Sequence, residues 1–549
     1  MRPISMKNIS GAALPARWAA TGVHRSPMAL LAAVTAAGAL LRFYGLEKES
    51  LWYDEALSYW YTTQEYGYLW REVPDFEIHP PVYGIMLKWW VSIFGDGEAG
   101  LRGLSALASA AVIPLAYYLG RTVSSNPWTG TLAAAFIAFS PAQLYFAQEA
   151  RPYAMLTLAA AIAMCGAYWM VENPARAALP WMGLKVRDRG AAGAWAALTL
   201  GGALAVWMHN MGALVLASLL VSVFPAVQWR LRGSLSFAAN ALLAACAILA
   251  LWAPFLPSLA LQSQRVVANF WLKKFTLGYF FNGIHNILFL LFPSWHFTAL
   301  ALALWLAGAW AAWKARGAMA AVLPVWMFLA PLAVSFVISW LIRPIFIYKT
   351  ILWAAVPFYI MAAWGLERAA GGGALLRLPA AAALLFLHVY ANYSYFVIST
   401  KEPWREIAGK IAAESSPGDV VLAIPNSASV PLGFYTGKSG APVRIVPLPV
   451  PYPARWMDRM YPVSPVDPAM KKGDEKLLQG YGCRPGAIWL VGWETKAFDP
   501  ESVVVNFLTA RCGPPARFRV KSIDVFRFGG GVRAGKAGPD ALAPGKDGR

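Results

Sequence analysis

The stretch Leu51-Trp52-Tyr53-Asp54-Glu55-Ala56 follows directly after the first long apolar segment, and Asp75-Phe76-Glu77-Ile78-His79-Pro80-Pro81 follows it in the same polar region. Two adjacent carboxylates therefore stand where a membrane helix would meet water, in a chain with only 28 acidic residues among 549. Ionisable groups near the apolar part of a membrane are costly and usually functional. We take this stretch as the first candidate for chemistry.

The composition around this stretch excludes a soluble protein for the first 400 residues or so. Hydrophobic residues make up 58% of the chain, charged residues make up 14%, and there are 26 tryptophans. The mean hydropathy is +0.47. So much apolar surface has no place in water, so the sequence predicts a polytopic α-helical membrane protein.

A formal net charge of +19 is compatible with nucleic-acid binding, but the basic residues come in small groups between apolar segments. In membrane proteins such groups mark cytoplasmic loops and contacts with anionic lipid headgroups. We therefore expect membrane lipids as partners, and no nucleic acid.

About 11 membrane spans are predicted, judged against the ~20 residues that a bilayer core requires. The apolar segments are 27–44, 104–119, 129–147, 153–171, 194–208, 211–227, 237–256, 297–313, 320–342, 346–366 and 374–397. Two more apolar stretches, 79–95 and 277–293, contain polar residues, and we expect them to lie in the outer interface. If both cross the membrane, the total is about 13.

The distribution of charge predicts which loops face which side. Residues 1–25 carry four arginines or lysines and no acid, and no clear cleavage site follows the first apolar segment, so we expect an uncleaved helix with a cytoplasmic N-terminus. The first outer loop then covers 45–102. The outer side also receives basic residues at the ends of spans, where positive charge is normally avoided: Arg151, Arg265, Arg343 and Lys349.

After Ser399 the sequence has no run long enough to cross a bilayer. Helix-like and strand-like patterns alternate: helices at 403–415 and 500–510, and strands at 419–424, 443–446, 487–492 and 518–528. We predict an α/β domain at 400–528 on the outer side and a disordered tail at 529–549. Cys483 and Cys512 are the cysteines of this part, and an oxidising compartment would permit a disulfide between them.

Asp54 has two interpretations of equal weight. Its carboxylate could act as a general base on an acceptor hydroxyl or amine at the floor of an outward cavity. Alternatively, it could favour the start of the helix near Ala56, because acids are stabilising at a helix N-terminus.

The segment containing Asp75, Glu77 and His79 places three candidate ligands on one side of an extended strand, a set that suits a divalent ion such as Mg²⁺, Mn²⁺ or Zn²⁺. A polar loop in which the two prolines begin the next helix is the simpler explanation. No cofactor is required by the pattern, and we find no phosphate-binding glycine loop.

The outer cations Arg151, Arg265, Arg343 and Lys349 could bind a lipid phosphate. Ordinary contact with headgroups explains some of them. An acid pair on the same side as several such cations indicates transfer of a group from a lipid phosphate. A transporter or flippase of a lipid-linked sugar is the alternative, although such proteins usually place ionisable groups near the middle of the membrane and have internal repeats.

Several motifs occur in a fixed order along the chain: Leu41-Arg42, residues 51–56, His79-Pro80-Pro81-Val82-Tyr83, Phe94-Gly95, Leu101-Arg102, Ser105-Ala106-Leu107, Tyr118-Leu119-Gly120-Arg121 and Gln148-Glu149-Ala150-Arg151-Pro152-Tyr153. This set resembles the bacterial branch of the GT-C glycosyltransferases (glycosyltransferase family 39/83-like), which includes relatives of the protein O-mannosyltransferases and of the lipid A aminoarabinose transferase. The resemblance covers residues 41–155 best, and Pro403-Trp404-Arg405-Glu406-Ile407-Ala408 also resembles the C-terminal domains of that branch.

This resemblance implies a GT-C catalytic domain at 26–399 and inverting transfer of a sugar from a polyprenyl phosphate donor. The acceptor would be a lipid, a glycan or a protein on the outer face of the cytoplasmic membrane. By motif match, Asp54 would be the catalytic acid/base, Glu55 its partner in the pair, and Arg151 a residue of the donor cavity. Relatives often carry an Arg-Tyr pair near the outer end of a late span, where this chain has Tyr348-Lys349 after Arg343.

Overall fold

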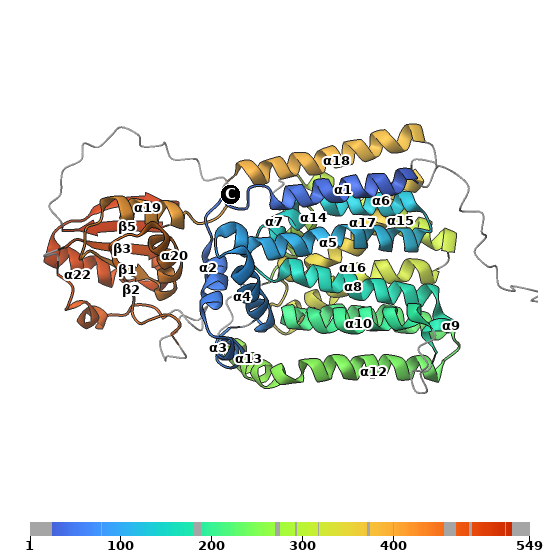
Figure 1. The fold of residues 1–549 in the computed structure, drawn as a ribbon, viewed down its shortest axis with the longest axis horizontal. Coiled ribbons are helices and arrows are strands. Elements are labelled where there is room, and N and C mark those ends of the chain that lie inside the picture. The colour runs from blue at the N-terminus through green and yellow to red at the C-terminus, as the bar shows by residue number, and fades with distance from the viewer. Residues whose placement is uncertain are drawn as a thin grey trace, which may run out of the picture.

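A computed structural model describes residues 25–529 except for positions 78, 180–187, 269–274, 291–293, 317, 370–373, 399, 455–467, 483–485 and 522. The N-terminal segment 1–24 and the tail from 530 onward lie outside the described residues, so the predictions for them stay predictions. A body of long, roughly parallel helices stands beside a smaller sheet domain, and the short helices of the first outer loop lie between the two (Figure 1).

The helical body follows the apolar segments of the sequence. Its helices are α1 (Arg25–Phe43), α5 (Glu98–Ser124), α6 (Pro127–Phe139), α7 (Pro141–Ala147), α8 (Tyr153–Glu172), α9 (Pro174–Ala177), α10 (Arg189–Met208), α11 (Ala213–Arg230), α12 (Leu235–Trp252), α13 (Leu256–Ala268), α14 (Leu277–Phe289), α15 (Trp295–Arg316), α16 (Ala318–Leu341), α17 (Ala355–Ala369) and α18 (Ala374–Val397). Short 3₁₀ turns link some of them: η4 (Asn210–Gly212), η5 (Ala253–Phe255) and η6 (Tyr348–Ala354).

The predicted polytopic helical fold is confirmed. Within the described residues, 8 helices are long and apolar enough to cross a membrane, and α6 with α7, bent by 54°, would make a ninth span. The apolar segments Pro27–Phe43 of α1 and Ala381–Val397 of α18 are shorter. The predicted total of about 11 is therefore reached only if the bent pair and both shorter helices also cross. The two stretches expected at the outer interface form α4 (Val82–Phe94) and α14, each 13 residues long and too short to span.

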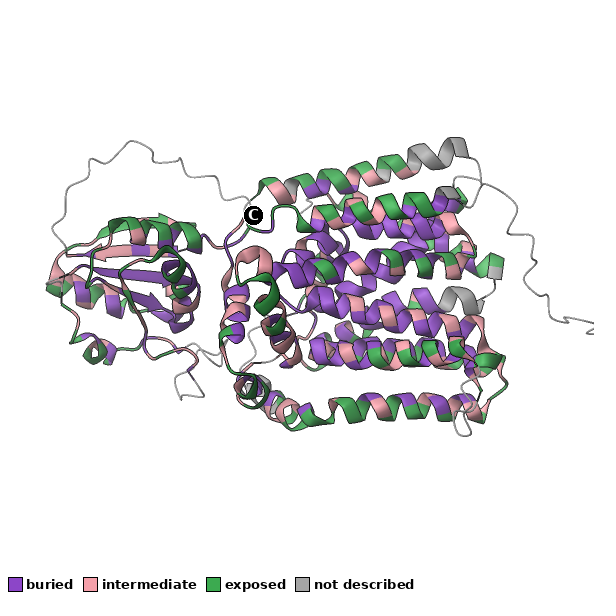
Figure 2. Cartoon of the chain, viewed as in Figure 1, coloured by how far each residue is buried: buried purple, intermediate pink, exposed green. Residues whose placement is uncertain are grey.

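Helix α17 is the most enclosed part of the body. The whole apolar stretch of η6 and α17 is buried, whereas α12 is exposed along most of its length at the edge (Figure 2). Glycines let α15 and α17 approach each other closely. A Cβ added at Gly308 or Gly365 would lie 1.9 Å from a carbonyl oxygen of the facing helix. This contact fixes α17, and with it η6, which carries Lys349.

The first outer loop folds into a small unit of its own. Its elements are α2 (Tyr53–Thr63), α3 (Tyr66–Arg71), η3 (Val73–Asp75) and α4. A cluster of buried apolar side chains holds it together: Leu57, Tyr61, Leu69, Val73 and Phe76. Tyr452 of the C-terminal domain packs against this cluster, so the loop lies between the two parts of the molecule.

The C-terminal domain is a five-stranded sheet in the order β2-β1-β3-β5-β4, with β1 parallel to β2 and β3, and β5 antiparallel to β3 and β4. Its elements are α19 (Trp404–Glu414), β1 (Val420–Ile424), η7 (Asn426–Ala428), α20 (Ser429–Ser439), β2 (Arg444–Pro447), η8 (Asp474–Leu478), β3 (Ile488–Trp493), α21 (Thr495–Phe498), α22 (Val503–Cys512), β4 (Ala516–Val520) and β5 (Ile523–Phe528). The single strand expected at 518–528 is wrong. Lys521 adopts a φ of 52°, which turns the chain and makes a hairpin of β4 and β5.

Candidate active site

Glu55 lies in the first turn of α2 and is fully buried. Its Oε1 accepts hydrogen bonds from Arg102 Nε at 2.7 Å and the Ala150 backbone N–H at 3.0 Å. Its Oε2 accepts from Arg102 Nη2 at 2.6 Å and Lys401 Nζ at 2.9 Å, and from the Trp52 N–H at 3.3 Å. Burial alone would raise the pKa of Glu55, but the two cations outweigh it and lower the pKa to about 2. This carboxylate is ionised and buried, and both of its oxygens accept hydrogen bonds.

Asp54 points elsewhere, because successive residues of a helix are rotated by about 100° from one another. Its side chain is 22% exposed, and its Oδ2 lies 3.7 Å from Lys349 Nζ and 3.9 Å from Arg151 Nε. The Nη1 of Arg151 also donates to the Asp54 backbone carbonyl at 3.3 Å. Asp54 is thus the partly exposed member of the acid pair, and two cations lie beside it.

Lys349 enters the site from η6, at the start of the enclosed helix α17. Its Nζ lies over the rings of Tyr153, at 5.1 Å from the centroid, and Trp52, at 5.5 Å. Aromatic faces attract a cation and hold it without neutralising its charge. The Lys349 ammonium therefore keeps a full positive charge next to Asp54.

A second polar cluster lies on the other side of Arg151. His79 Nδ1 lies 2.5 Å from Glu77 Oε1, Tyr61 donates its hydroxyl hydrogen to Glu77 Oε2, and Arg151 Nη2 lies 3.3 Å from His79 Nδ1. Burial lowers the pKa of His79, and the charge of Arg151 lowers it further. Burial alone would raise the pKa of Glu77, but His79, Arg151 and Tyr61 together lower it to about 2. The cluster holds a carboxylate against an imidazole whose pKa lies below its usual range.

Two of the three expected metal ligands come together here. Glu77 and His79 are in direct contact, whereas the Asp75 side chain lies outside the described residues. No group of three His, Cys, Asp or Glu side chains suited to a metal ion occurs in the part of the chain that the structure describes. The described side chains thus supply a pair of ligands that already bond to each other, and we derive no step through a metal.

Glu149 is a buried acid that the sequence did not single out as a site residue. It is 1% exposed, and its Oε2 has no hydrogen-bond partner among the described residues. Burial raises its pKa to about 7, against the charges of Lys401 and Lys349. It follows Gln148 in the segment between α7 and α8 that also carries Arg151. A titratable group therefore lies close to the candidate site without touching Asp54.

Arg102 and Lys401 were also missed as site residues. Arg102 belongs to the Leu101-Arg102 motif of the resemblance, so that motif was its only signal. Lys401 had none, because 346 positions separate it from Glu55. Of the expected cations, Arg343 is half-buried between α16 and η6, and the Arg265 side chain lies outside the described residues.

The cysteine prediction is covered only in part by the described residues. Cys512 is disulfide-bonded, and Cys165 and Cys246 are free thiols. Cys483 lies outside the described residues. The predicted pairing of Cys483 with Cys512 therefore stays a prediction.

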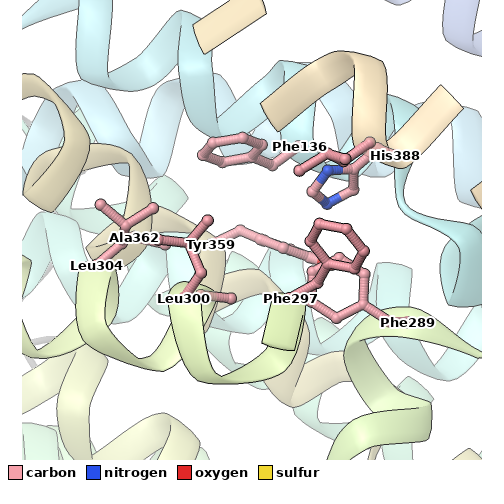
Figure 3. Close-up of a pocket in the computed structure, with 10 residues that line it drawn as sticks. Phe136, Phe289, Phe297, Leu300, Leu304, Tyr359, Ala362 and His388 are labelled. Carbon is pink, nitrogen blue, oxygen red and sulfur yellow. The ribbon is translucent and has the colours of Figure 1, made fainter. Parts of the chain in front are cut away.

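Two hollows differ in character. One adjoins the second polar cluster, with Ser58, Tyr61, Glu77, His79 and Arg151 among its lining residues. The other lies among the helices of the body and is apolar (Figure 3). Its described lining includes Phe136, Phe289, Phe297, Tyr359 and His388. Only the first has the charged groups that chemistry on a polar substrate requires.

Comparisons with known proteins identify the fold. No protein-family model matches the sequence, and neither does any curated protein. Among solved structures, ArnT from Cupriavidus metallidurans in the apo state matches with a TM-score of 0.59 and 15% identity over 92% of this chain and 98% of ArnT. The same protein bound to undecaprenyl phosphate gives a TM-score of 0.53 at 15% identity over 93% of this chain and 98% of ArnT.

The archaeal oligosaccharyltransferase AglB from Archaeoglobus fulgidus, in complex with an inhibitory peptide and a dolichol-phosphate, gives a TM-score of 0.51. It shares 11% identity over 92% of this chain and 74% of AglB. The GT-C fold predicted by resemblance is therefore confirmed.

The low pKa of Glu55 predicts how stability changes with pH. Its pKa of about 2 in the folded protein lies below the ordinary value of 4.5, so its ionised form stabilises the fold above pH 4.5 and this contribution is lost as the pH falls toward 2. We expect Glu55→Gln to lower Tm at pH 7. When the pH falls from about 5 to about 3, the Tm of this variant should decrease less than the Tm of the unchanged protein. Thermal unfolding of the purified protein in detergent measures both.

Glu414→Gln is the matched control, because Glu414 is 41% exposed and pairs with Lys410 one turn along the same helix. This control should keep both the Tm and its pH dependence. If Glu55→Gln showed the pH dependence of the unchanged protein, the stabilising role of the ionised Glu55 would be wrong.

Proposed function

We propose that this protein is a membrane glycosyltransferase that moves a sugar from a polyprenyl phosphate donor to a lipid, glycan or protein acceptor. The observation that carries the proposal is the partly exposed Asp54 carboxylate with Lys349 at 3.7 Å and Arg151 at 3.9 Å. The fold supports it, because ArnT, which shares this fold, has been solved with undecaprenyl phosphate bound, and AglB with a dolichol-phosphate. An acid beside fixed cations suits a substrate that must lose a proton and a donor that carries a phosphate.

In the proposed reaction, the acceptor hydroxyl or amine approaches Asp54 and gives its proton to the carboxylate. The acceptor oxygen or nitrogen forms a bond to the anomeric carbon while the bond from that carbon to the phosphate oxygen breaks. The polyprenyl phosphate leaves with the electron pair, and Lys349 and Arg151 stabilise its charge. A single displacement from the opposite face inverts the configuration of the anomeric carbon.

The two acids of the pair take different roles in this proposal. Asp54 handles the proton, whereas Glu55 has no free oxygen and no access to water, so its expected catalytic role does not fit its position. We assign Glu55 to positioning. His79, which bonds to Glu77 through Nδ1, lies against Arg151 from the other side, with its Nε2 3.5 Å from Arg151 Nη2.

The proposed site faces the outer side of the cytoplasmic membrane. The support is the distribution of basic groups in the sequence, with Arg121, Arg230 and Lys314 at the opposite ends of the spans. A single cysteine in place of Lys438, which is 43% exposed in the C-terminal domain, should react with a membrane-impermeant maleimide on intact cells. A cysteine in place of Lys314 should react only after the membrane is opened, and labelling of both from one side would overturn the orientation.

Asp54→Asn tests the general base. The amide cannot accept the proton, so we expect transfer to fall by about 10²- to 10⁴-fold while membrane insertion is unchanged. Mass spectrometry of membrane lipids should show the same polyprenyl-phosphate sugar accumulating in cells with Asp54→Asn and in cells without the protein.

Asp96→Asn is the control for this test, since Asp96 is an acid of the same outer loop that is 53% exposed and pairs with Lys438. It should transfer normally. Full transfer by Asp54→Asn would remove the general base, and an unchanged lipid pool in cells without the protein would favour a transporter.

Lys349→Met tests the donor site. Methionine has a similar shape without charge, and losing a hydrogen bond to a charged group costs about 1.5 to 3 kcal/mol, so donor affinity should fall by about tenfold to a hundredfold. The affinity is measured by titrating the purified protein with polyprenyl phosphate. Lys314→Met, an exposed lysine at the far end of α15, serves as control, and equal affinity in all three proteins would exclude Lys349 from the donor site.

A further inference from the structure

Lys401 is an unusual lysine because it is buried. It lies in the linker between α18 and α19, the only connection in sequence between the helical body and the C-terminal domain, and it is 5% exposed. Lysine is almost never fully buried unless it is paired. Its place at the joint between the two parts suggests that it connects them.

The Lys401 ammonium holds two segments of the candidate site at once. Its Nζ donates to Glu55 Oε2 at 2.9 Å and to the Gln148 backbone carbonyl at 3.0 Å. Glu55 in turn accepts the Ala150 N–H at 3.0 Å. The segment 148–150 is therefore fixed at both ends, and the next residue is Arg151, which bonds to the Asp54 carbonyl.

The same linker holds the start of α2. Glu402 Oε2 accepts the Tyr53 N–H at 2.9 Å, and the Ser50 hydroxyl donates to the Glu402 carbonyl. Glu49 accepts the backbone N–H groups of Thr400 at 3.0 Å and of Lys401 at 3.2 Å. Residues 400–402 thus lie alongside 49–53, and Asp54 follows directly.

The C-terminal domain in turn fixes the linker. Lys521 Nζ, from the β4–β5 hairpin, donates to the Lys401 carbonyl at 2.7 Å. The rings of Tyr53 and Trp493 stack with centroids 4.8 Å apart. Tyr435 accepts the Leu51 N–H at 2.6 Å through its hydroxyl oxygen. The position of the C-terminal domain therefore affects the start of α2, which carries Asp54, and, through Lys401, the segment 148–151, which carries Arg151.

We propose that Lys401 is a positioning residue for the transfer reaction, and that through it the C-terminal domain is part of the catalytic unit. This inference rests on the proposed function. Lys401 touches neither Asp54 nor the place of the donor phosphate, and it acts by keeping Asp54 and Arg151 in register across two chain segments. A displacement of about 1 Å in such a site can cost about 10²-fold in rate.

Three single variants of the full-length protein test the proposal: Lys401→Met, Lys401→Arg and Lys438→Met. Lys438 lies at the same domain interface, pairs with Asp96 at 2.9 Å and is 43% exposed, so it is the matched control. We expect Lys401→Met to lower kcat by about 10²-fold with the KM for donor changed by less than about threefold, because Lys349 still binds the phosphate. Lys401→Arg should recover most of kcat, and Lys438→Met should match the unchanged protein.

Hydrogen exchange supplies a second measurement that does not depend on transfer. The backbone N–H groups of Ala150 and Tyr53 should exchange faster in Lys401→Met than in the unchanged protein, and at the unchanged rate in Lys438→Met. If the unchanged protein transferred no sugar, the proposed function would be wrong. The exchange rates would then still show whether Lys401 positions the segments that carry Asp54 and Arg151.

Unchanged kcat and unchanged exchange in Lys401→Met would overturn the inference, as would an equal loss of kcat in Lys438→Met. Should Lys401→Met not give a folded protein, Lys401→Arg carries the comparison, since it keeps a positive charge beside Glu55. A Lys401→Arg protein with the kcat of the unchanged protein would support the inference. The inference would be contradicted by a Lys401→Arg protein whose backbone N–H groups exchange at the unchanged rate but whose kcat is as low as that expected for Lys401→Met.

Discussion

Glu55 is a carboxylate without access to water, and a buried charge of this kind is tolerated only when it is paired and hydrogen-bonded. Arg102 makes a bidentate contact with Glu55 through hydrogen bonds of 2.7 and 2.6 Å, and Lys401 donates a third at 2.9 Å. These partners come from α5 and from the linker before α19, and the Ala150 N–H comes from the segment after α7. Because the ionised Glu55 is held by partners from α5, from the linker and from the segment after α7, four distant parts of the chain meet at this point.

The rest of the site follows from that meeting. Glu55 fixes the first turn of α2, so Asp54 is turned toward the cations. Arg151 donates to the Asp54 carbonyl on one side and lies against Nε2 of His79 on the other, while Nδ1 of His79 bonds to Glu77. Two adjacent acids of one helical turn therefore have opposite environments: Glu55 is buried with both oxygens hydrogen-bonded, and Asp54 is partly exposed beside two cations. Such a division of roles between neighbouring carboxylates is how a site combines rigidity with reactivity.

The two parts of the molecule supply different halves of this arrangement. The helical body contributes Lys349 through η6, whose position is set by the close contact of α17 with α15 at Gly308 and Gly365. The C-terminal domain contributes the linker and covers the outer loop, with Trp493 stacked on Tyr53. The linker that joins the C-terminal domain to the body also bonds to the first turn of α2. The position of this domain therefore affects the site.

Composition and hydropathy alone were enough to predict a polytopic helical fold, a C-terminal α/β domain and most of its strands, because burial in a membrane and the alternation of a sheet leave periodic patterns in the sequence. The ordered motifs predicted the GT-C fold and singled out Asp54, Glu55 and Arg151. The spacing of Asp75, Glu77 and His79 predicted a candidate metal site. The sequence could not separate the roles of Asp54 and Glu55, or reveal Lys401 as a partner of Glu55. Those depend on which way a side chain turns from a helix and on contacts across 346 positions, and only the tertiary structure brings such residues together.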